Sequence, residues 1–158
     1  MNYFELFEIP VSLKVDKSML AKKYFELQKK YHPDFFTQAG EEGQATALEK
    51  SSSINKALKM LQNQDETIKY VLELKGLLAG DEKYQLPQDF LMDMMDLNEN
   101  LSADSATAIN TIVTDLYDEV KDIIEGYNES TSNEALQKVK AYYFKKKYVQ
   151  RILERLDG

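Results

Sequence analysis

His32 is the only histidine of the chain, and it stands in the run Tyr31-His32-Pro33-Asp34, two residues from a carboxylate. An imidazole close to a carboxylate can serve as a general base or acid. That chemistry would also need a nucleophile and an orienting group, and the sequence places neither near His32. It also has no glycine-rich phosphate loop and no nucleophile elbow. We therefore expect no enzymatic activity, and we interpret His32 together with the segments around it.

The residue types rule out several kinds of site. The 158 residues include no cysteine and one histidine, which excludes disulfides, thiolate metal sites and zinc sites with several His or Cys ligands. We expect no metal and no cofactor. No apolar run approaches the ~20 residues that a membrane-spanning helix needs, and the N-terminus lacks the pattern of a secretory signal. We therefore expect a cytoplasmic protein with no membrane contact.

The net charge of −7 is unevenly distributed. Residues 1–75 hold 11 Lys and 11 Asp or Glu, whereas residues 76–158 hold 9 Lys or Arg and 16 Asp or Glu. Phosphate binding needs a basic surface, so nucleic acid is not expected as a partner of that second part.

Two predicted helices hold His32 between them. Residues 16–31 have the apolar period of an amphipathic helix, Asp16 is a suitable N-cap, and Pro33 ends the segment. The helical period resumes over residues 41–62. Two helices joined by a short connection pack antiparallel, so His32 and Asp34 are expected at the tip of a helical hairpin. The predicted apolar stripes are Leu20, Tyr24, Leu27 and Tyr31 on the first helix, and Ala47, Ile54, Leu58 and Leu61 on the second.

Four lysines of the first hairpin helix form two pairs at a spacing of seven residues, Lys22 with Lys29 and Lys23 with Lys30. Each pair therefore shares one side of the helix. This pattern is typical of a solvated face, and it would equally suit docking to an acidic partner.

The remaining segments also predict helices. A short helix over residues 2–8 precedes the hairpin, and another over 65–76 follows it and ends at Gly76. The segment 76–86 has two glycines and many polar residues, which predicts a domain boundary. Beyond it, three amphipathic stretches over 87–101, 104–127 and 131–156 predict a three-helix bundle.

The first helix of that bundle has two apolar faces. Phe90, Met94, Leu97 and Leu101 form one complete stripe. A second face has its centre about 160° away and consists of Leu91, Met92 and Met95, with Asp96 and Glu99 beside them. Either the helix is wrapped on all sides, or its second face is a binding surface with an acidic border.

Several of these segments resemble one known family. The His32-Pro33-Asp34 tripeptide, with Tyr24 and Leu27 before it and Ile54-Asn55-Lys56-Ala57 on the following helix, resembles a J-domain. The stretches MNYFELFEIP, LQNQDETIKYVLELKG and DFLMDMMDLNENL extend the resemblance over essentially the whole chain, to the HscB family of bacterial iron–sulfur cluster assembly.

The resemblance implies an all-α chain with a J-domain over residues 1–75, a linker over 76–86 and a three-helix bundle over 87–158. It implies a co-chaperone that stimulates the ATPase of HscA or another DnaK-class chaperone and delivers the scaffold protein IscU to it. We expect a monomer. The implied chaperone-binding residues are His32, Pro33, Asp34, Lys22, Lys23, Lys29 and Lys30. The implied scaffold-binding residues are Leu91, Met92, Met95, Asp96, Glu99 and an aromatic residue of the last helix, Tyr143 or alternatively Tyr142.

The sequence departs from the family at several positions, among them Met95, where a leucine is often seen. Residues that are often or usually basic are here Phe25, Glu26 and Phe35. Two alternatives stay open at this point: a J-protein with a different client, and a helical adaptor that stimulates no ATPase.

Overall fold

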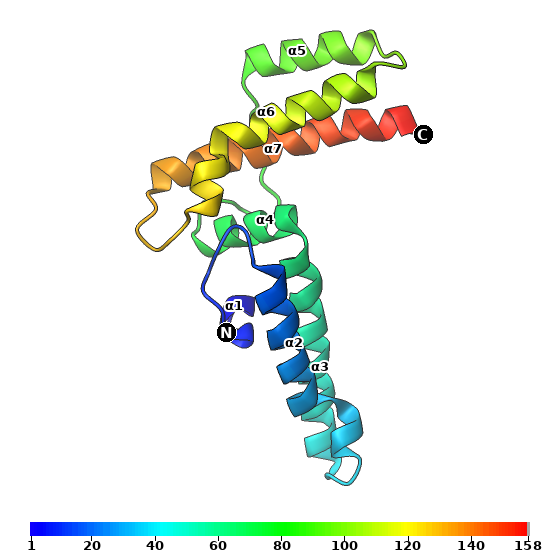
Figure 1. Ribbon diagram of the computed structural model, residues 1–158, viewed down its shortest axis with the longest axis vertical. Coiled ribbons are helices and arrows are strands. Elements are labelled where there is room, and N and C mark those ends of the chain that lie inside the picture. The colour runs from blue at the N-terminus through cyan, green and yellow to red at the C-terminus, as the bar shows by residue number, and fades with distance from the viewer. Residues whose placement is uncertain (158) are drawn as a thin grey trace. The chain divides into compact units, whose positions relative to one another are not determined.

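The computed structural model describes residues 1–157, and these form seven α-helices, one 3-10 helix and no strand (Figure 1). The prediction of an all-α chain is therefore confirmed. The residues divide into two compact units, 1–71 and 72–158. The helices are α1 (Tyr3–Phe7), α2 (Lys17–Tyr31), η1 (Pro33–Phe36), α3 (Glu41–Gln62), α4 (Gln64–Leu74), α5 (Gln88–Glu99), α6 (Ser105–Glu125) and α7 (Asn133–Asp157).

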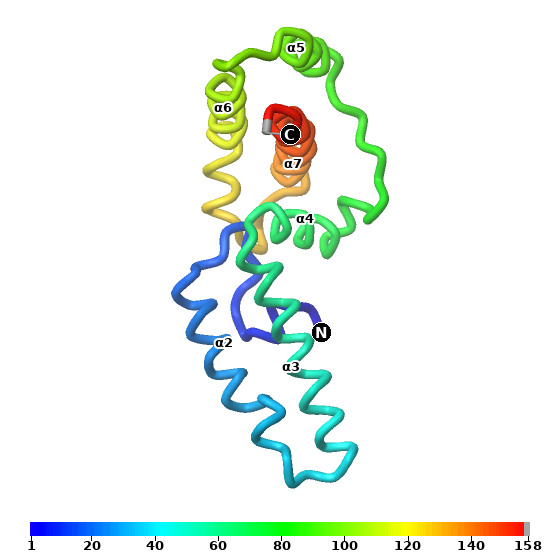
Figure 2. Tube along the Cα trace, turned by 90° about the vertical axis from the view of Figure 1, so that its right-hand side faces the viewer, coloured from blue at the N-terminus to red at the C-terminus, as the bar shows by residue number. Residues whose placement is uncertain are grey.

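The first unit is built on the hairpin of α2 and α3, which lie side by side in Figures 1 and 2. Asp16 caps α2 as predicted, and its Oδ1 accepts a hydrogen bond from the Met19 N–H at 2.9 Å. Leu20 on α2 and Ile54 on α3 are fully buried. The Tyr24 hydroxyl donates to Asn55 Oδ1 at 2.9 Å, which ties the two helices together nearer the tip.

Burial of the apolar stripe of α2 decreases toward the tip of the hairpin. Tyr24, Leu27 and Tyr31 of the predicted stripe are only partly buried. The reason is that α1 packs against α2 and α3 and supplies the buried rings of Phe4 and Phe7, whereas it does not extend to the tip. Near the tip α3 packs against η1 and keeps Ala47 buried, whereas the outer side of α2 is open to solvent.

The segment 76–86 belongs to the second unit and is attached to α7. Glu82 Oε2 lies 2.6 Å from the Nζ of Lys140, which is itself almost buried. The rings of Tyr84 and Phe144 stack with their centroids 4.6 Å apart. The Lys140 ammonium, followed by the Ala79 N–H, holds the pKa of the Glu82 carboxyl below its usual value. We call residues 82–84 the strap. The boundary between the two units falls inside α4, a few residues before the predicted end of the first domain at 75, and the second unit includes the predicted linker.

The second unit is a three-helix bundle. Helices α6 and α7 run antiparallel and bury Ile109 and Val120 against Leu136 and Val149. Helix α5 covers this pair through longer side chains. Its Met94 is buried, and Asn98 accepts a hydrogen bond from the Arg155 guanidinium of α7 at 3.0 Å.

Candidate functional site

His32 joins the end of α2 to the start of η1. Its N–H donates to the Gln28 carbonyl at 2.9 Å, which closes α2, and its own carbonyl accepts from the Phe35 N–H at 3.0 Å. Pro33 requires an extended conformation of the preceding residue, and His32 adopts it with φ −61° and ψ 132°. Proline is also well suited to the first position of the helical turn that follows. The sequence thus turns the chain sharply at His32.

The His32 ring is fixed by its neighbour. Its Nδ1 accepts a hydrogen bond from the Asp34 N–H at 3.1 Å and lies 3.6 Å from the Asp34 carboxylate. These two contacts hold the imidazole ring next to the Asp34 side chain. The ring is partly exposed and the Asp34 carboxylate is exposed, so both groups are available to a partner.

The four predicted lysines all lie on the solvent side of α2, and three of them have a neighbour there. The Lys23 ammonium is 3.9 Å from the Glu26 carboxylate. The Lys29 ammonium lies 4.6 Å from the centre of the Phe25 ring, and that of Lys30 lies 5.3 Å from the Tyr31 ring. Such exposed contacts are weak, so these cations remain accessible to an acidic surface.

The second face of α5 is open. Met92 and Met95 are 59% and 54% exposed, whereas Met94, on the opposite stripe, is 4% exposed. Asp96 and Glu99 are exposed, and Leu91 is partly buried. Of the two interpretations of this helix, a helix wrapped on all sides is wrong for the residues that the structure describes. The surface of Leu91, Met92, Met95, Asp96 and Glu99 is called the methionine face below.

Tyr143, the aromatic residue of α7 predicted to belong to this surface, is 3% exposed, and its place in an interface stays a prediction. Its ring contacts the Phe144 ring and the Lys147 ammonium, both on α7 itself. The aromatic residue of α7 that lies against α5 is Tyr148, whose ring centroid is 6.1 Å from that of Phe90. Sequence reasoning missed Tyr148, although its spacing of four residues from Phe144 and from Ile152 indicates the same side of α7.

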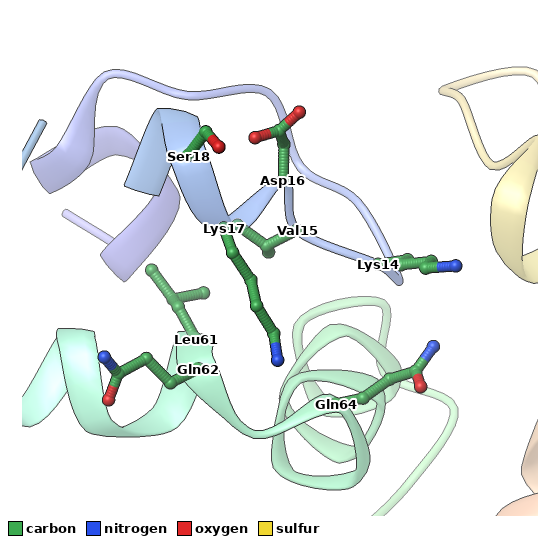
Figure 3. A pocket seen from close by; sticks show the side chains of 8 residues that line it. All are labelled: Lys14, Val15, Asp16, Lys17, Ser18, Leu61, Gln62 and Gln64. Atoms are coloured by element: carbon green, nitrogen blue, oxygen red, sulfur yellow. The ribbon is translucent and has the colours of Figure 1, made fainter. Parts of the chain in front are cut away.

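A pocket of about 610 Å³ lies in the first unit, at the opposite end of α2 from His32 (Figure 3). Leu61 and Lys17 line it, together with the loop before α2 and the start of α4. Asp16, on its rim, is already engaged as the N-cap of α2. Residues 16 and 32 are about 24 Å apart along the helix, so pocket and candidate site are separate. Among residues 1–157 no acidic, His or Cys cluster could hold a metal ion, and no helix is long and apolar enough to cross a membrane.

A family model and several curated relatives that match this chain carry the name HscB. Residues 86–157 match the family model described as the HSCB C-terminal oligomerisation domain. A co-chaperone protein HscB homolog of Vibrio vulnificus is 38% identical over 102 residues, which are 64% of this chain but only 60% of that relative. The co-chaperone protein HscB of Proteus mirabilis is 30% identical over 172 residues, which cover 100% of this chain and 99% of the relative.

Two solved structures share the fold. Chaperone HscB from Vibrio cholerae has a TM-score of 0.64 and 27% identity, and each chain covers 99% of the other. The human co-chaperone protein HscB has a TM-score of 0.78 and 26% identity over 99% of this chain and 81% of the human one. Because the match to the Proteus mirabilis relative extends over both proteins almost completely, and the helical architecture agrees with both structures, this chain belongs to the HscB family of co-chaperones.

Proposed function

We propose that this protein is a co-chaperone, without catalytic activity of its own, that stimulates ATP hydrolysis by HscA or another DnaK-class chaperone. We propose that residues 1–75 act as its J-domain and that His32, Pro33, Asp34 and the four lysines of α2 contact the chaperone. The observation that carries the proposal is the sharp turn at His32, which holds the imidazole ring beside an exposed carboxylate at the end of a lysine-bearing helix.

The physical requirement for stimulation is differential binding. A chaperone ATPase accelerates when its domains adopt a hydrolysis-competent arrangement. A partner can shift that equilibrium only by as much as it prefers one arrangement over the other. The rigid connection of His32 to both α2 and η1 favours such discrimination, because a ring and a carboxylate in fixed positions fit one arrangement of a partner better than another.

We propose that the second unit binds an IscU-type iron–sulfur scaffold through the methionine face of α5. Met92 and Met95 provide an adaptable apolar centre, and Asp96 and Glu99 provide a charged rim, which is the usual anatomy of an interface. We propose Tyr143 as the aromatic contribution of α7, as the resemblance implies, and the less buried Tyr148 as the second candidate. Holding the client beside the chaperone raises its effective concentration there. We further propose that one monomer acts on one chaperone in the cytoplasm, with residues 76–86 connecting the two functional parts.

Single-turnover ATP hydrolysis by HscA tests the proposal, measured with this protein, with IscU, and with both. We expect stimulation by this protein alone and greater stimulation when IscU is added. Asp34→Asn should abolish both effects while the protein still binds IscU. Equal stimulation by the Asp34→Asn variant would refute the role of His32 and Asp34, and stimulation that is indifferent to IscU would identify a different client.

A further inference from the structure

Two large aromatic side chains near His32 are exposed. Phe25 on α2 is 60% exposed and Phe35 in η1 is 66% exposed. A single apolar residue on a surface is ordinary, but a group of them marks an interaction site. Neither residue can be explained by packing within the first unit, because less than half of each is covered there.

Each ring contacts one neighbour, Phe25 with Lys29 and Phe35 with His32, and helical spacing brings the two pairs to one side of the chain. At 100° per residue, positions 25, 29 and 32 fall within about 60° of one another on α2. The Lys29 ammonium lies 4.6 Å from the centre of the Phe25 ring. The His32 and Phe35 rings meet edge to face with centroids 6.1 Å apart. We call Phe25, Lys29, His32 and Phe35 the aromatic ridge.

We propose that the aromatic ridge is the apolar docking element for the ATPase chaperone, and that it seats in an apolar hollow bordered by acidic side chains. This inference rests on the proposed function, since His32 belongs both to the ridge and to the proposed chaperone-binding site. Two phenyl rings gain most from burial in an apolar hollow. The Lys29 ammonium lies against the Phe25 ring and would therefore reach the edge of the same hollow. Carboxylates at that edge would pair with it.

The charges around the ridge favour a protein partner. Lys22 and Lys30 are exposed on the same helix, which attracts an acidic surface. The exposed Asp34 carboxylate next to His32 would repel a polyphosphate backbone or an anionic membrane surface. A protein surface with separate acidic groups around an apolar centre can pair with the lysines and still leave room for the Asp34 carboxylate.

The ridge makes docking partly independent of salt. Attraction between exposed charges is screened as the Debye length falls from about 10 Å at 0.1 M to about 3 Å at 1 M. Burial of phenyl rings is not weakened by that change. We therefore expect the lysines to set the association rate and the two rings to set the residual affinity at high salt.

The test uses the full chain and HscA, with the dissociation constant and the maximal ATPase stimulation measured at about 0.1 M and about 1 M salt. The variants are Phe25→Ser and Phe35→Ser. Serine and phenylalanine have similar helix propensities, so Phe25→Ser should leave α2 intact. The control is Leu48→Ser, which removes a similarly exposed apolar side chain from α3. Each ring variant should weaken binding about tenfold, and the loss should be clearer at high salt.

The outcomes separate this inference from the proposed function. If the wild-type chain neither binds nor stimulates HscA, the proposed function fails. If it does both and the two ring variants bind as tightly as the wild type, or no more weakly than Leu48→Ser, the ridge is not a docking element. Sedimentation identifies a different occupant: if wild type self-associates and the ring variants do not, while their affinity for HscA is unchanged, the rings bind a second copy and the inference is overturned.

Discussion

Met92 and Met94 offer a matched comparison within one helix. They are the same residue type two positions apart on α5, with exposures of 59% and 4%. Truncating a buried methionine to alanine removes its transfer free energy and leaves a cavity, so Met94→Ala should lower the free energy of unfolding by ~2–5 kcal/mol. The Met92 side chain stays largely hydrated in the folded protein, so Met92→Ala should change the free energy of unfolding by no more than ~0.5 kcal/mol.

Binding to IscU should show the reverse order. If Met92 becomes buried at the interface, its truncation should cost about 1–2 kcal/mol, which is roughly a 5- to 30-fold loss of affinity. Met94→Ala should leave the affinity of the still-folded molecules nearly unchanged, because its side chain does not reach the surface. Urea unfolding followed by circular dichroism gives the stabilities, and calorimetric titration with IscU gives the affinities. If Met92→Ala destabilises the protein as much as Met94→Ala and leaves the affinity intact, the methionine face is not an interface.

Three further expectations follow from the other contacts. His32→Gln should abolish ATPase stimulation with an unchanged unfolding midpoint, because the ring is partly exposed; stimulation equal to that of the wild type would count against its role. The association rate with HscA should fall as salt rises, owing to the four lysines of α2, and a rate independent of ionic strength would exclude them from steering. Because the pKa of Glu82 is lowered in the folded protein, the ionised carboxyl stabilises the fold. This stabilisation is complete above the ordinary pKa of the carboxyl and is lost as pH falls through the lowered value. Glu82→Gln should therefore destabilise the protein at neutral pH, and its difference from wild type in urea midpoint should shrink in acid; a constant difference would contradict the assigned pKa.

The elements of this protein could be predicted because their determinants are local. The N-cap at Asp16, the stop at Pro33 and the apolar period of α2 act within a few residues of one another. The two faces of α5 also followed from its own period, and the exposures of Met92 and Met94 agree with that division. The extended conformation of His32 is likewise determined locally, by Pro33 directly after it.

Contacts between distant segments could not be predicted in the same way. The ion pair of Glu82 with Lys140 and the stack of Tyr84 on Phe144 join the strap to residues about 60 positions later. Nothing in the segment 76–86 indicates them, since it has neither helical nor alternating apolar spacing. Its glycines and polar residues predicted a linker, and composition alone does not distinguish an extended segment attached to a helix from a free one.

The choice between Tyr143 and Tyr148 shows where helical periodicity stops being informative. Helix α7 carries aromatic residues on several sides, and period alone ranks them all as candidates for packing. Which of them faces α5 depends on the rotation of α7 against α6, and the residues buried between α6 and α7 set that rotation. With Val139 and Tyr142 turned toward α6 or the interior, Tyr143 is covered as well, and the next aromatic residue along the chain that can meet Phe90 is Tyr148. Replacing either tyrosine by alanine should weaken IscU binding if that residue contributes to the surface, and Tyr143→Ala should also lower stability because its ring is buried, so measuring both quantities on this pair decides which tyrosine belongs to the surface.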